Sequence, residues 1–245
     1  MATTAAQRPA RAGANTEKPV PFRTGETLSY DVSWASYFTA GTATVTVLEK
    51  KPSFNSNAYY IVAEGRPTPL LSRLYTLYYK ADTLLDVYSL LPHRGSVYSE
   101  EGRRKEMKVT RFDHAARRAR YEQELGGRQT AAENVTIPAG THDVVSMLFA
   151  LRTMPMKPGT KTTMPFVNNG DNYTMHAVVR NRESVRSGLG STSAWKITPT
   201  ILDADGRPEG SGYALWLTDD DRRLPVQMEA TLPVGTFRLI LRSAR

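Results

Sequence analysis

From Glu26 onward, large apolar residues alternate with polar residues along most of the chain. The first run shows the pattern plainly, with Leu28, Tyr30 and Trp34 on one side of the alternation. Successive side chains of a β-strand point to opposite faces, so a period of two predicts strands that bury one face. About a dozen such runs follow one another without βαβ alternation. The pattern therefore predicts a mainly β fold, built as a single curled antiparallel sheet.

Polar turns separate these runs. Residues 168–171 (Asn-Asn-Gly-Asp) and 203–206 (Asp-Ala-Asp-Gly) are rich in residue types that accept positive φ, so both predict hairpin turns. Gly188 and Gly190 could belong to a dinucleotide-binding loop, but such a loop opens a helix. The residues that follow them alternate like a strand, and a third hairpin turn is therefore the better interpretation.

Two segments have helical spacing instead. Thr68 can cap a first short amphipathic helix, and Pro69 suits its first position because the missing N–H would be unpaired there. A second helix is predicted to begin after Thr141 as N-cap, with Asp143 in the first turn facing the helix dipole. Pro155 ends it. We expect both helices to cover the inner side of the sheet.

The first 24 residues differ in composition from the rest of the chain. They are rich in Ala, Thr, Pro and Gly, have a net charge of +3, and contain almost no large apolar side chains. Such a segment cannot offset the entropy lost on ordering. We predict a disordered basic arm over residues 1–24 and a single β domain over residues 25–245.

The chemistry of the chain points away from catalysis. It contains no cysteine, which excludes disulfides and thiolate sites, and it lacks the G-x-S-x-G pattern of a serine hydrolase. The short acidic runs 203–205 and 219–221 are better explained by turn chemistry than by a calcium loop. No two of the histidines show the spacing of a zinc pair: His93, His114, His142 and His176. We expect no enzyme, no cofactor and no metal site, although a triad assembled in space stays open.

The formal net charge is +8, which favours anionic partners at long range. Basic residues gather between positions 103 and 120 among aromatic side chains, an arrangement that can bind nucleic acid. Acidic residues are interleaved there and cancel much of the charge, so a solvated outer sheet face explains the segment better. Nucleic acid is therefore a disfavoured partner. No apolar run reaches 18 residues, and no membrane-spanning segment is expected.

The first helix and the first strand supply the candidate ligand-binding residues. Aromatic and leucine side chains could line an apolar cavity beneath a helical lid, although core packing would account for the same residues. The set comprises Tyr30, Trp34, Leu70, Leu74, Tyr75 and Tyr78.

Several of these features occur together in a known family. They are the run FRTGETLSYDVSW from Phe22, Gly41, Pro92, the run THDVVSMLFALR from Thr141, the run WLTDDDRRLPV from Trp216, and Gly235. In their order and spacing the chain resembles the domain-of-unknown-function 3108 family of bacterial exported proteins. The resemblance implies a periplasmic protein whose signal peptide has been removed. It also implies a half-open barrel like that of lipoprotein carriers, which hold an acyl chain beneath helices.

Together these observations predict a non-enzymatic protein of the cell envelope. Its curved sheet would bind a lipid, another apolar or amphiphilic ligand, or a segment of an envelope protein partner. An alternative is an assembly or scaffold protein that pairs through exposed sheet edges. A lesser alternative is nucleic-acid binding through the basic hairpin of residues 103–120.

Overall fold

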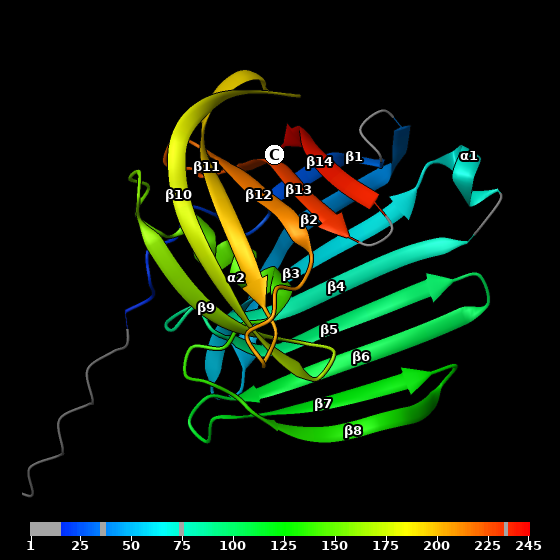
Figure 1. The fold of residues 1–245 in the computed structure, drawn as a ribbon. Helices are drawn as coiled ribbons and strands as arrows, with labels where there is room; N and C mark the ends of the chain where they lie inside the picture. The colour runs from blue at the N-terminus through cyan, green and yellow to red at the C-terminus, as the bar shows by residue number, and fades with distance from the viewer. Residues whose placement is uncertain (1–15, 35–37, 74–75, 233–234) are drawn as a thin grey trace, which may run out of the picture.

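The structure is a computed structural model that describes residues 16–34, 38–73, 76–232 and 235–245 (Figure 1). These residues form a mainly β fold with 14 strands and two helices. The strands are β1 (Thr27–Trp34), β2 (Phe38–Ser53), β3 (Ser56–Pro67), β4 (Leu77–Asp86), β5 (Pro92–Glu101), β6 (Arg104–Asp113), β7 (Arg118–Leu125), β8 (Arg128–Thr136), β9 (Lys161–Asn168), β10 (Asp171–Ser187), β11 (Gly190–Leu202), β12 (Ser211–Thr218), β13 (Pro225–Leu232) and β14 (Gly235–Ala244). The helices are α1 (Pro69–Ser72) and α2 (Val144–Arg152).

All 14 strands belong to one antiparallel sheet. Consecutive strands pair with each other except β8 and β9, and β1 also pairs with β14, so the first and last strands lie side by side within the sheet. The two sheet edges are β8 and β9. The sheet curls around α2 without closing into a barrel (Figure 1). The predicted half-open barrel is confirmed.

Two of the predicted hairpin turns are tight, as expected. Asp171 pairs with Asn168 across the β9–β10 turn, and Ser187 pairs with Gly190 across the β10–β11 turn. The segment 203–206 instead begins a longer loop between β11 and β12. The Asp203 carboxylate accepts hydrogen bonds from the backbone N–H groups of Asp205 and Arg207, and these bonds hold the loop wide.

One end of the half-open barrel is bridged by the β9–β10 turn. A Cβ added to Gly170 would lie 2.9 Å from the ring of Tyr121 on β7, so the turn backbone rests directly on that ring. Asn172 also donates a hydrogen bond of 2.9 Å from Nδ2 to the carbonyl oxygen of Thr136 at the end of β8. At the opposite end, on the side of α1, no described helix covers the concave face, and we call this the open end (Figure 1).

The second helix forms where it was predicted, but Asp143 is its N-cap instead of Thr141. The Asp143 carboxylate accepts from the Ser146 backbone N–H, and the Ser146 hydroxyl accepts from the Asp143 N–H. The reason lies in His142, which is still extended and bridges to β9 through two backbone hydrogen bonds. The helix therefore cannot begin before Asp143.

The first helix is much shorter than predicted. Thr68 caps it and Pro69 begins it, as expected, but it ends at Ser72 and buries no residue. Leu74 and Tyr75, which belonged to the predicted helix, lie outside the described residues. The prediction that both helices cover the inner side is therefore wrong for α1, because its single turn projects from the end of β3 instead of packing into the sheet.

Residues 16–24, the last part of the predicted arm, contact the rest of the chain. Lys18 donates hydrogen bonds to the carbonyl oxygens of Val87 and Ser89, and Phe22 is only 6% exposed. Phe22 packs edge-on against Phe149 of α2, which gives this segment the apolar contact that its composition alone did not suggest. The part of the arm before residue 16 lies outside the described residues.

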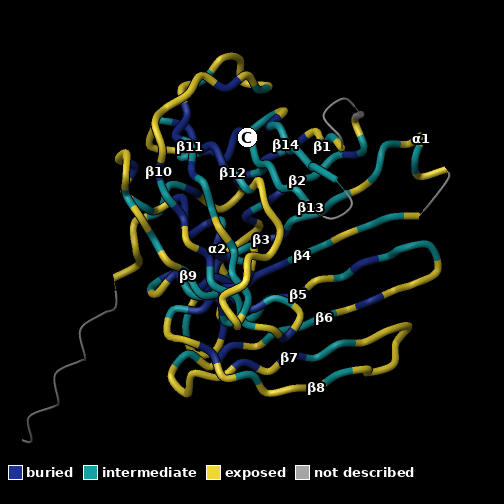
Figure 2. Tube along the Cα trace, in the orientation of Figure 1, coloured by how far each residue is buried: buried dark blue, intermediate teal, exposed yellow. Residues whose placement is uncertain are grey.

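Arg152 at the end of α2 joins distant parts of the chain. Its guanidinium is fully buried and forms two bonds of 2.6 and 3.1 Å with the carboxylate of Glu26. It also donates to the carbonyl oxygens of Arg222 and Arg223 and lies over the rings of Phe22 and Phe149. Burial is concentrated around this helix, whereas β8 is exposed along most of its length (Figure 2).

Candidate functional site

The residues predicted to line a pocket are dispersed in the structure. Tyr30 is fully buried in the core and donates a 2.9 Å hydrogen bond to the carbonyl oxygen of Pro225. Trp34 is 45% exposed and stacks on Phe237, and Leu70 is 65% exposed on α1. Tyr78 is half-buried, and its hydroxyl donates to Glu64. The four described residues do not line one hollow, and their role in ligand binding stays a prediction.

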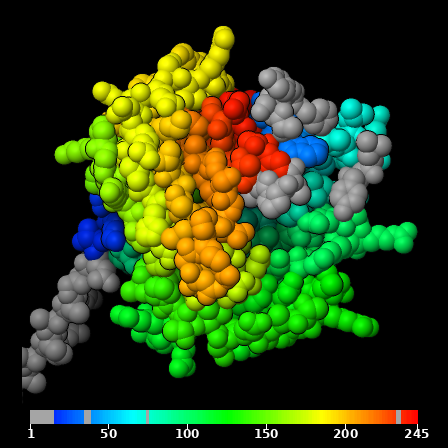
Figure 3. Space-filling view, in the orientation of Figure 1, coloured from blue at the N-terminus to red at the C-terminus, as the bar shows by residue number. Residues whose placement is uncertain are grey.

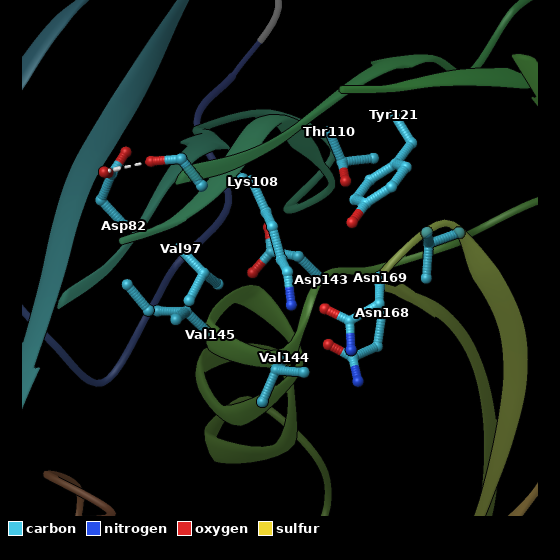
Figure 4. A pocket seen from close by; sticks show the side chains of 14 residues that line it. Asp82, Val97, Lys108, Thr110, Tyr121, Asp143, Val144, Val145, Asn168 and Asn169 are labelled. Carbon is cyan, nitrogen blue, oxygen red and sulfur yellow. Dashed lines mark hydrogen bonds between the residues drawn. The ribbon is translucent and has the colours of Figure 1, made fainter. Parts of the chain in front are cut away.

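A different hollow lies on the concave face, between the start of α2, the middle of strands β4 to β7 and the β9–β10 turn (Figure 4). Its volume is about 250 Å³. It is lined by Ala81, Asp82, Gly95, Ser96, Val97, Lys108, Thr110, Tyr121, Asp143, Val144, Val145, Val167, Asn168 and Asn169. Sequence elements far apart in the chain therefore meet at one place, which we call the α2 hollow.

The α2 hollow has an apolar side and a polar side. Strands β4 and β5 and the first turn of α2 provide the apolar side, formed by Ala81, Val97, Val144 and Val145. Strands β6 and β7 and the β9–β10 turn provide hydrogen-bonding groups, formed by Lys108, Thr110, Tyr121, Asn168 and Asn169. Figure 4 shows Lys108 reaching toward the two asparagines across the hollow. Such a mixture suits a molecule with an apolar part and a polar part.

Asp143 lies at the inner end of the hollow. Its carboxylate accepts a 2.6 Å hydrogen bond from the Thr83 hydroxyl in addition to the capping bond from Ser146. Burial raises the pKa of Asp143 to about 6, although these hydrogen bonds act in the opposite direction. Gly95 on β5 makes room for this carboxylate, since a Cβ there would lie 3.1 Å from it.

The pKa of His142, the residue before Asp143, is shifted in the opposite direction. Burial lowers the pKa of His142 to about 4, and the nearby His114 contributes in the same direction. The Nδ1 atom of His142 lies 3.3 Å from the Ser146 hydroxyl. Burial therefore shifts the pKa values of two adjacent residues in the direction of their neutral forms, one a base and the other an acid.

Lys108 is the cation of the hollow. Its Nζ lies 3.2 Å from the carboxylate of Glu106, which is itself buried and also receives hydrogen bonds from Arg104 and Gln123. Burial alone would raise the pKa of Glu106, but the bonds from Gln123, Lys108 and Arg104 outweigh it, so the pKa is lowered. Glu106 therefore stays charged and holds Lys108 at the edge of the hollow.

Small side chains continue the concave face from the hollow toward the open end. In the strand register Val97 lies beside Ala81, Ala81 beside Ala63, and Ala63 beside Val45. The next row towards the open end pairs Tyr79 with Gly65. Paired residues of an antiparallel sheet share a face, so these rows lie together on the concave face, and we call this strip of mainly small side chains the trough. Figure 3 shows a recess in this part of the surface, behind the β11–β12 loop.

A larger and more open hollow, of about 1010 Å³, lies at the end opposite α1. It contains His93, His114 and the exposed Phe54, together with three arginines. Two of these arginines, Arg111 and Arg120, form ion pairs with Glu122. The third, Arg118, forms no ion pair among the described residues, and neither do Arg103 and Arg117, so the charges of the basic hairpin are matched only in part.

Sequence reasoning missed the α2 hollow because each of its polar residues had a simpler explanation. Lys108 belongs to a charged hairpin, Asp143 to a helix start, and Asn168 to a turn. One signal was available, because Gly95 stands in the middle of a predicted strand. A glycine at such a position often marks a close approach by another group, and here that group is the Asp143 carboxylate.

Among the residues described, no group of three or more His, Asp or Glu side chains is arranged to hold a metal ion. The same residues include no helix that is long and apolar enough to cross a membrane.

Several solved structures are similar to this chain. A β-barrel-like DUF1849 protein from Brucella abortus has a TM-score of 0.54 at 11% identity, covering 90% of this chain and 97% of its own. A protein from Bacteroides fragilis, described as exported and YmcC-like, has a TM-score of 0.36 at 12% identity, covering 94% and 100%. A Parabacteroides distasonis protein described as a lipoprotein has a TM-score of 0.35 at 9% identity, covering 92% and 98%.

The first of these structures supports the barrel-like fold alone, because its identity is low. No curated protein matches the chain. A family model described as "Protein of unknown function (DUF3108)" matches residues 29–242.

Proposed function

The chain belongs to the DUF3108 family, whose description gives no activity, and from that premise we propose a function on the geometry. We propose that it is a non-enzymatic protein of the cell envelope that binds an amphiphilic ligand in the α2 hollow. The observation that carries the proposal is the division of this hollow into an apolar side and a hydrogen-bonding side.

The volume of the hollow limits what the ligand can be. At about 250 Å³ it is slightly smaller than the roughly 300 Å³ at which drug-sized pockets begin. It would hold a short chain, or the polar end of a longer chain whose remainder lies in the trough. Because alanine and glycine are small, an alkyl chain would have room to lie over Ala63, Gly65 and Ala81 in the trough.

The polar groups of the hollow suit a ligand with an anionic or carbonyl oxygen. Lys108, Asn168 and Asn169 can donate hydrogen bonds from one wall. The ammonium of Lys108 would exchange part of its contact with Glu106 for the ligand, because its stem is flexible and has three donors.

Binding accounts for the ionisable groups better than catalysis does. The Asp143 carboxylate is committed to Thr83 and to the helix cap, and Lys108 is committed to Glu106. The hollow is lined by no histidine that could act as a general base. Hydrogen bonds and an ion pair fix these groups in position, as a binding site requires.

A fluorescent fatty acid, 11-(dansylamino)undecanoic acid, tests the proposal. The protein is first stripped of bound lipid by denaturation and refolding, and the dansyl emission is then titrated. We expect saturable binding, and weaker binding in Lys108→Ala by roughly tenfold, the value of one charge-assisted hydrogen bond. Ala81→Leu, which fills the hollow, should also weaken binding. No saturable binding to the stripped protein would refute the proposal.

Matched controls exist on the same elements. Lys105 lies on β6, is ion-paired with Glu100 and is exposed, so Lys105→Ala removes a similar cation outside the hollow. Ala132 is exposed on β8, so Ala132→Leu adds the same volume outside it. Both control variants should bind the probe as the unmodified protein does.

The envelope location is a separate part of the proposal. It is supported by the bacterial exported proteins that the chain resembles in its motifs. Fractionation of a bacterial host that expresses the native gene, followed by immunodetection, tests it. The protein should be released with the periplasmic or envelope fraction, and recovery with the cytoplasmic fraction alone would contradict this location.

A second candidate function rests on the sheet edge at β8. This strand is exposed along most of its length, and β8 pairs with β7 on one side only. A free strand edge can add a strand from another chain. An assembly or scaffold role therefore predicts a dimer or larger complex by light scattering, abolished by Ala132→Pro. A strict monomer at all concentrations would exclude self-assembly through this edge.

A further inference from the structure

The open end of the half-open barrel has a rim with its own composition. The strand register places the ends of β1, β4, β5, β6, β7 and β8 together with α1 on this side, as Figure 1 shows. Exposed apolar residues and arginines occur at successive turns around it. We call this set the rim: Trp34, Leu70, Arg73, Arg103, Leu125 and Arg128.

The apolar members of the rim are unusually exposed. Leu70 is 65% exposed, Trp34 45% and Leu125 37%. They lie singly on different elements, since Leu70 is in α1, Trp34 ends β1 and Leu125 ends β7. The single turn of α1 is capped by Thr68 yet buries no residue, so its leucine is held out toward the solvent. Packing against the described residues does not account for the position of Leu70, whereas Trp34 stacks on Phe237.

The cations of the rim stand apart from the carboxylates around them. Within the described chain, Arg73, Arg103 and Arg128 form no ion pair. The nearby carboxylates Glu100 and Glu106 are already paired with lysine or arginine side chains. Two rim-side carboxylates among the described residues, Glu101 and Glu124, are without such a pair, and the three unpaired arginines outnumber them.

We propose that the rim docks on the surface of a membrane that contains anionic lipids. Leucine side chains would enter the boundary between headgroups and acyl chains, Trp34 would lie at headgroup depth, and the arginines would bind lipid phosphates. Single apolar residues separated by cations match such a boundary. A protein partner would instead require a contiguous apolar centre with a polar border.

This inference rests on the proposed function and names the source of the ligand. The small side chains of the trough lead from the α2 hollow toward Tyr79, on the side of the rim. A docked rim would place the trough against the acyl region, so that an amphiphile could pass from the membrane into the protein without crossing water. The surface and the ligand site would then be two parts of one path.

Co-sedimentation with vesicles tests the docking surface. The full chain is mixed with sucrose-loaded vesicles of phosphatidylcholine containing 30% phosphatidylglycerol, or of phosphatidylcholine alone, in low salt. We expect binding to the anionic vesicles that weakens with added salt. Leu70→Glu should lower the partition coefficient roughly tenfold, because it replaces an inserted leucine by a charge. Arg73→Glu should lower it by at least about fivefold, since each basic residue near an anionic surface contributes about that factor and the variant also adds a negative charge.

The chain offers a matched control pair at a distant turn. Arg186 and Leu189 have the same spacing as Leu70 and Arg73, are both exposed, and lie at the β10–β11 turn. Leu189→Glu and Arg186→Glu should leave vesicle binding unchanged. Circular dichroism and thermal unfolding check that every variant is folded, which is expected because α1 buries no residue.

Three outcomes would overturn the inference. They are the absence of co-sedimentation, equal losses in the rim and control variants, and a dimer broken by Leu70→Glu in the absence of vesicle binding, which would replace the membrane by a second copy. Failure of the proposed function is distinguishable, because it would abolish titration with the soluble dansyl probe and leave vesicle binding intact. Conversely, probe binding without vesicle binding would retain the ligand site and remove the docking surface.

Discussion

The concave face of the sheet is covered differently around α2 and on the open side. Around α2 the concave face is filled, with Phe149 at 1% and Ile61 at 0% exposure, and Arg152 joins the helix to two other parts of the chain. Toward the open end no helix covers the sheet among the described residues, and ion pairs such as Glu106–Lys108 take the place of a core.

The difference indicates that one region provides most of the stability and the other provides an accessible surface. Apolar burial is the main source of folding free energy, so the α2 region should carry most of the stability of the domain. The β4–β8 side can then leave a trough unfilled, because its strands are held by their ladder to the filled half. A binding surface on that side costs the fold little, which is the expected division between scaffold and site.

The largest effect is expected from breaking the buried ion pair. Arg152→Met leaves the carboxylate of Glu26 in the core without its partner and removes donors from the carbonyls of Arg222 and Arg223. Unpaired buried charges cost about 3–5 kcal/mol. We expect the free energy of unfolding, measured by urea denaturation, to fall by about that amount. The double variant Arg152→Met with Glu26→Gln should recover part of the loss.

An exposed pair provides the comparison. Arg182 and Asp219 lie 2.6 Å apart, but the Arg182 side chain is 57% exposed. Arg182→Met should cost less than about 1 kcal/mol, because solvent screens an exposed pair. Similar losses for Arg152→Met and Arg182→Met would show that the α2 region is not the main source of stability.

The next effect concerns pH and separates His142 from Asp143. The pKa of Asp143 is raised to about 6 in the fold, so its stabilising contribution is present at low pH and is lost as pH rises towards 6. The pKa of His142 is lowered to about 4, so its contribution is present above its ordinary value of 6.5 and is lost as pH falls towards 4. Between pH 4 and 6 the two residues therefore change the free energy of unfolding in opposite directions. Each contribution changes by about 3 kcal/mol over its full range.

Single variants should therefore uncover the opposing slopes. Relative to the unmodified protein, Asp143→Asn should become more stable as pH rises from 4 to 6, because it removes the destabilising ionisation. His142→Gln should become less stable over the same range, because the slope of Asp143 is then unopposed. Urea denaturation at several pH values measures both. If the free energy of unfolding of all three proteins had the same pH dependence, the pKa shifts of His142 and Asp143 would be contradicted.

Much of this filled region was predictable, because its signals are local. The alternation from Glu26 predicted the strands, and the turn chemistry at Gly170 predicted a hairpin that forms. The motif runs that resemble the family also meet in space: Glu26, Arg152 and Arg222 come from three of them and are joined by the guanidinium of Arg152. The spacing within each run indicated its local structure, but nothing in the runs indicated that they meet.

The hollow and the rim were not predictable, because they depend on register over long distances. Lys108 faces the hollow only because β6 pairs with β5 so that it lies beside Val97, and a shift of one residue would turn it to the outside. The separation of Tyr30 from Leu70 has a related reason. The spacing of the residues from Leu70 onward resembles that of an amphipathic lid, but α1 ends after one turn and Tyr30 bonds to Pro225 in the core.

A smaller effect is expected where the two regions touch. Gly170 has a positive φ and rests on the ring of Tyr121, so Gly170→Ala combines backbone strain with a clash against β7. We expect a loss of about 1–3 kcal/mol and faster amide exchange in β9. Gly127 at the open end also has a positive φ, but a Cβ there would meet nothing within 4 Å. Gly127→Ala should therefore cost only about 1 kcal/mol, and equal losses would argue against the closing contact.

The smallest effect should come from the outer face of the open half. Arg120 lies 2.9 Å from Glu122 on β7, and its side chain is 51% exposed. Arg120→Ala should change the free energy of unfolding by less than about 0.5 kcal/mol, since Glu122 keeps its second partner Arg111 and water replaces the lost contact. Amide exchange in β7 and β8 should already be faster than in β1 and β14 and should change little in this variant. A loss above about 1.5 kcal/mol, or slower exchange in β8 than in β14, would mean that the open half contributes to the cooperative core, and that its trough cannot be separated from the stability of the fold.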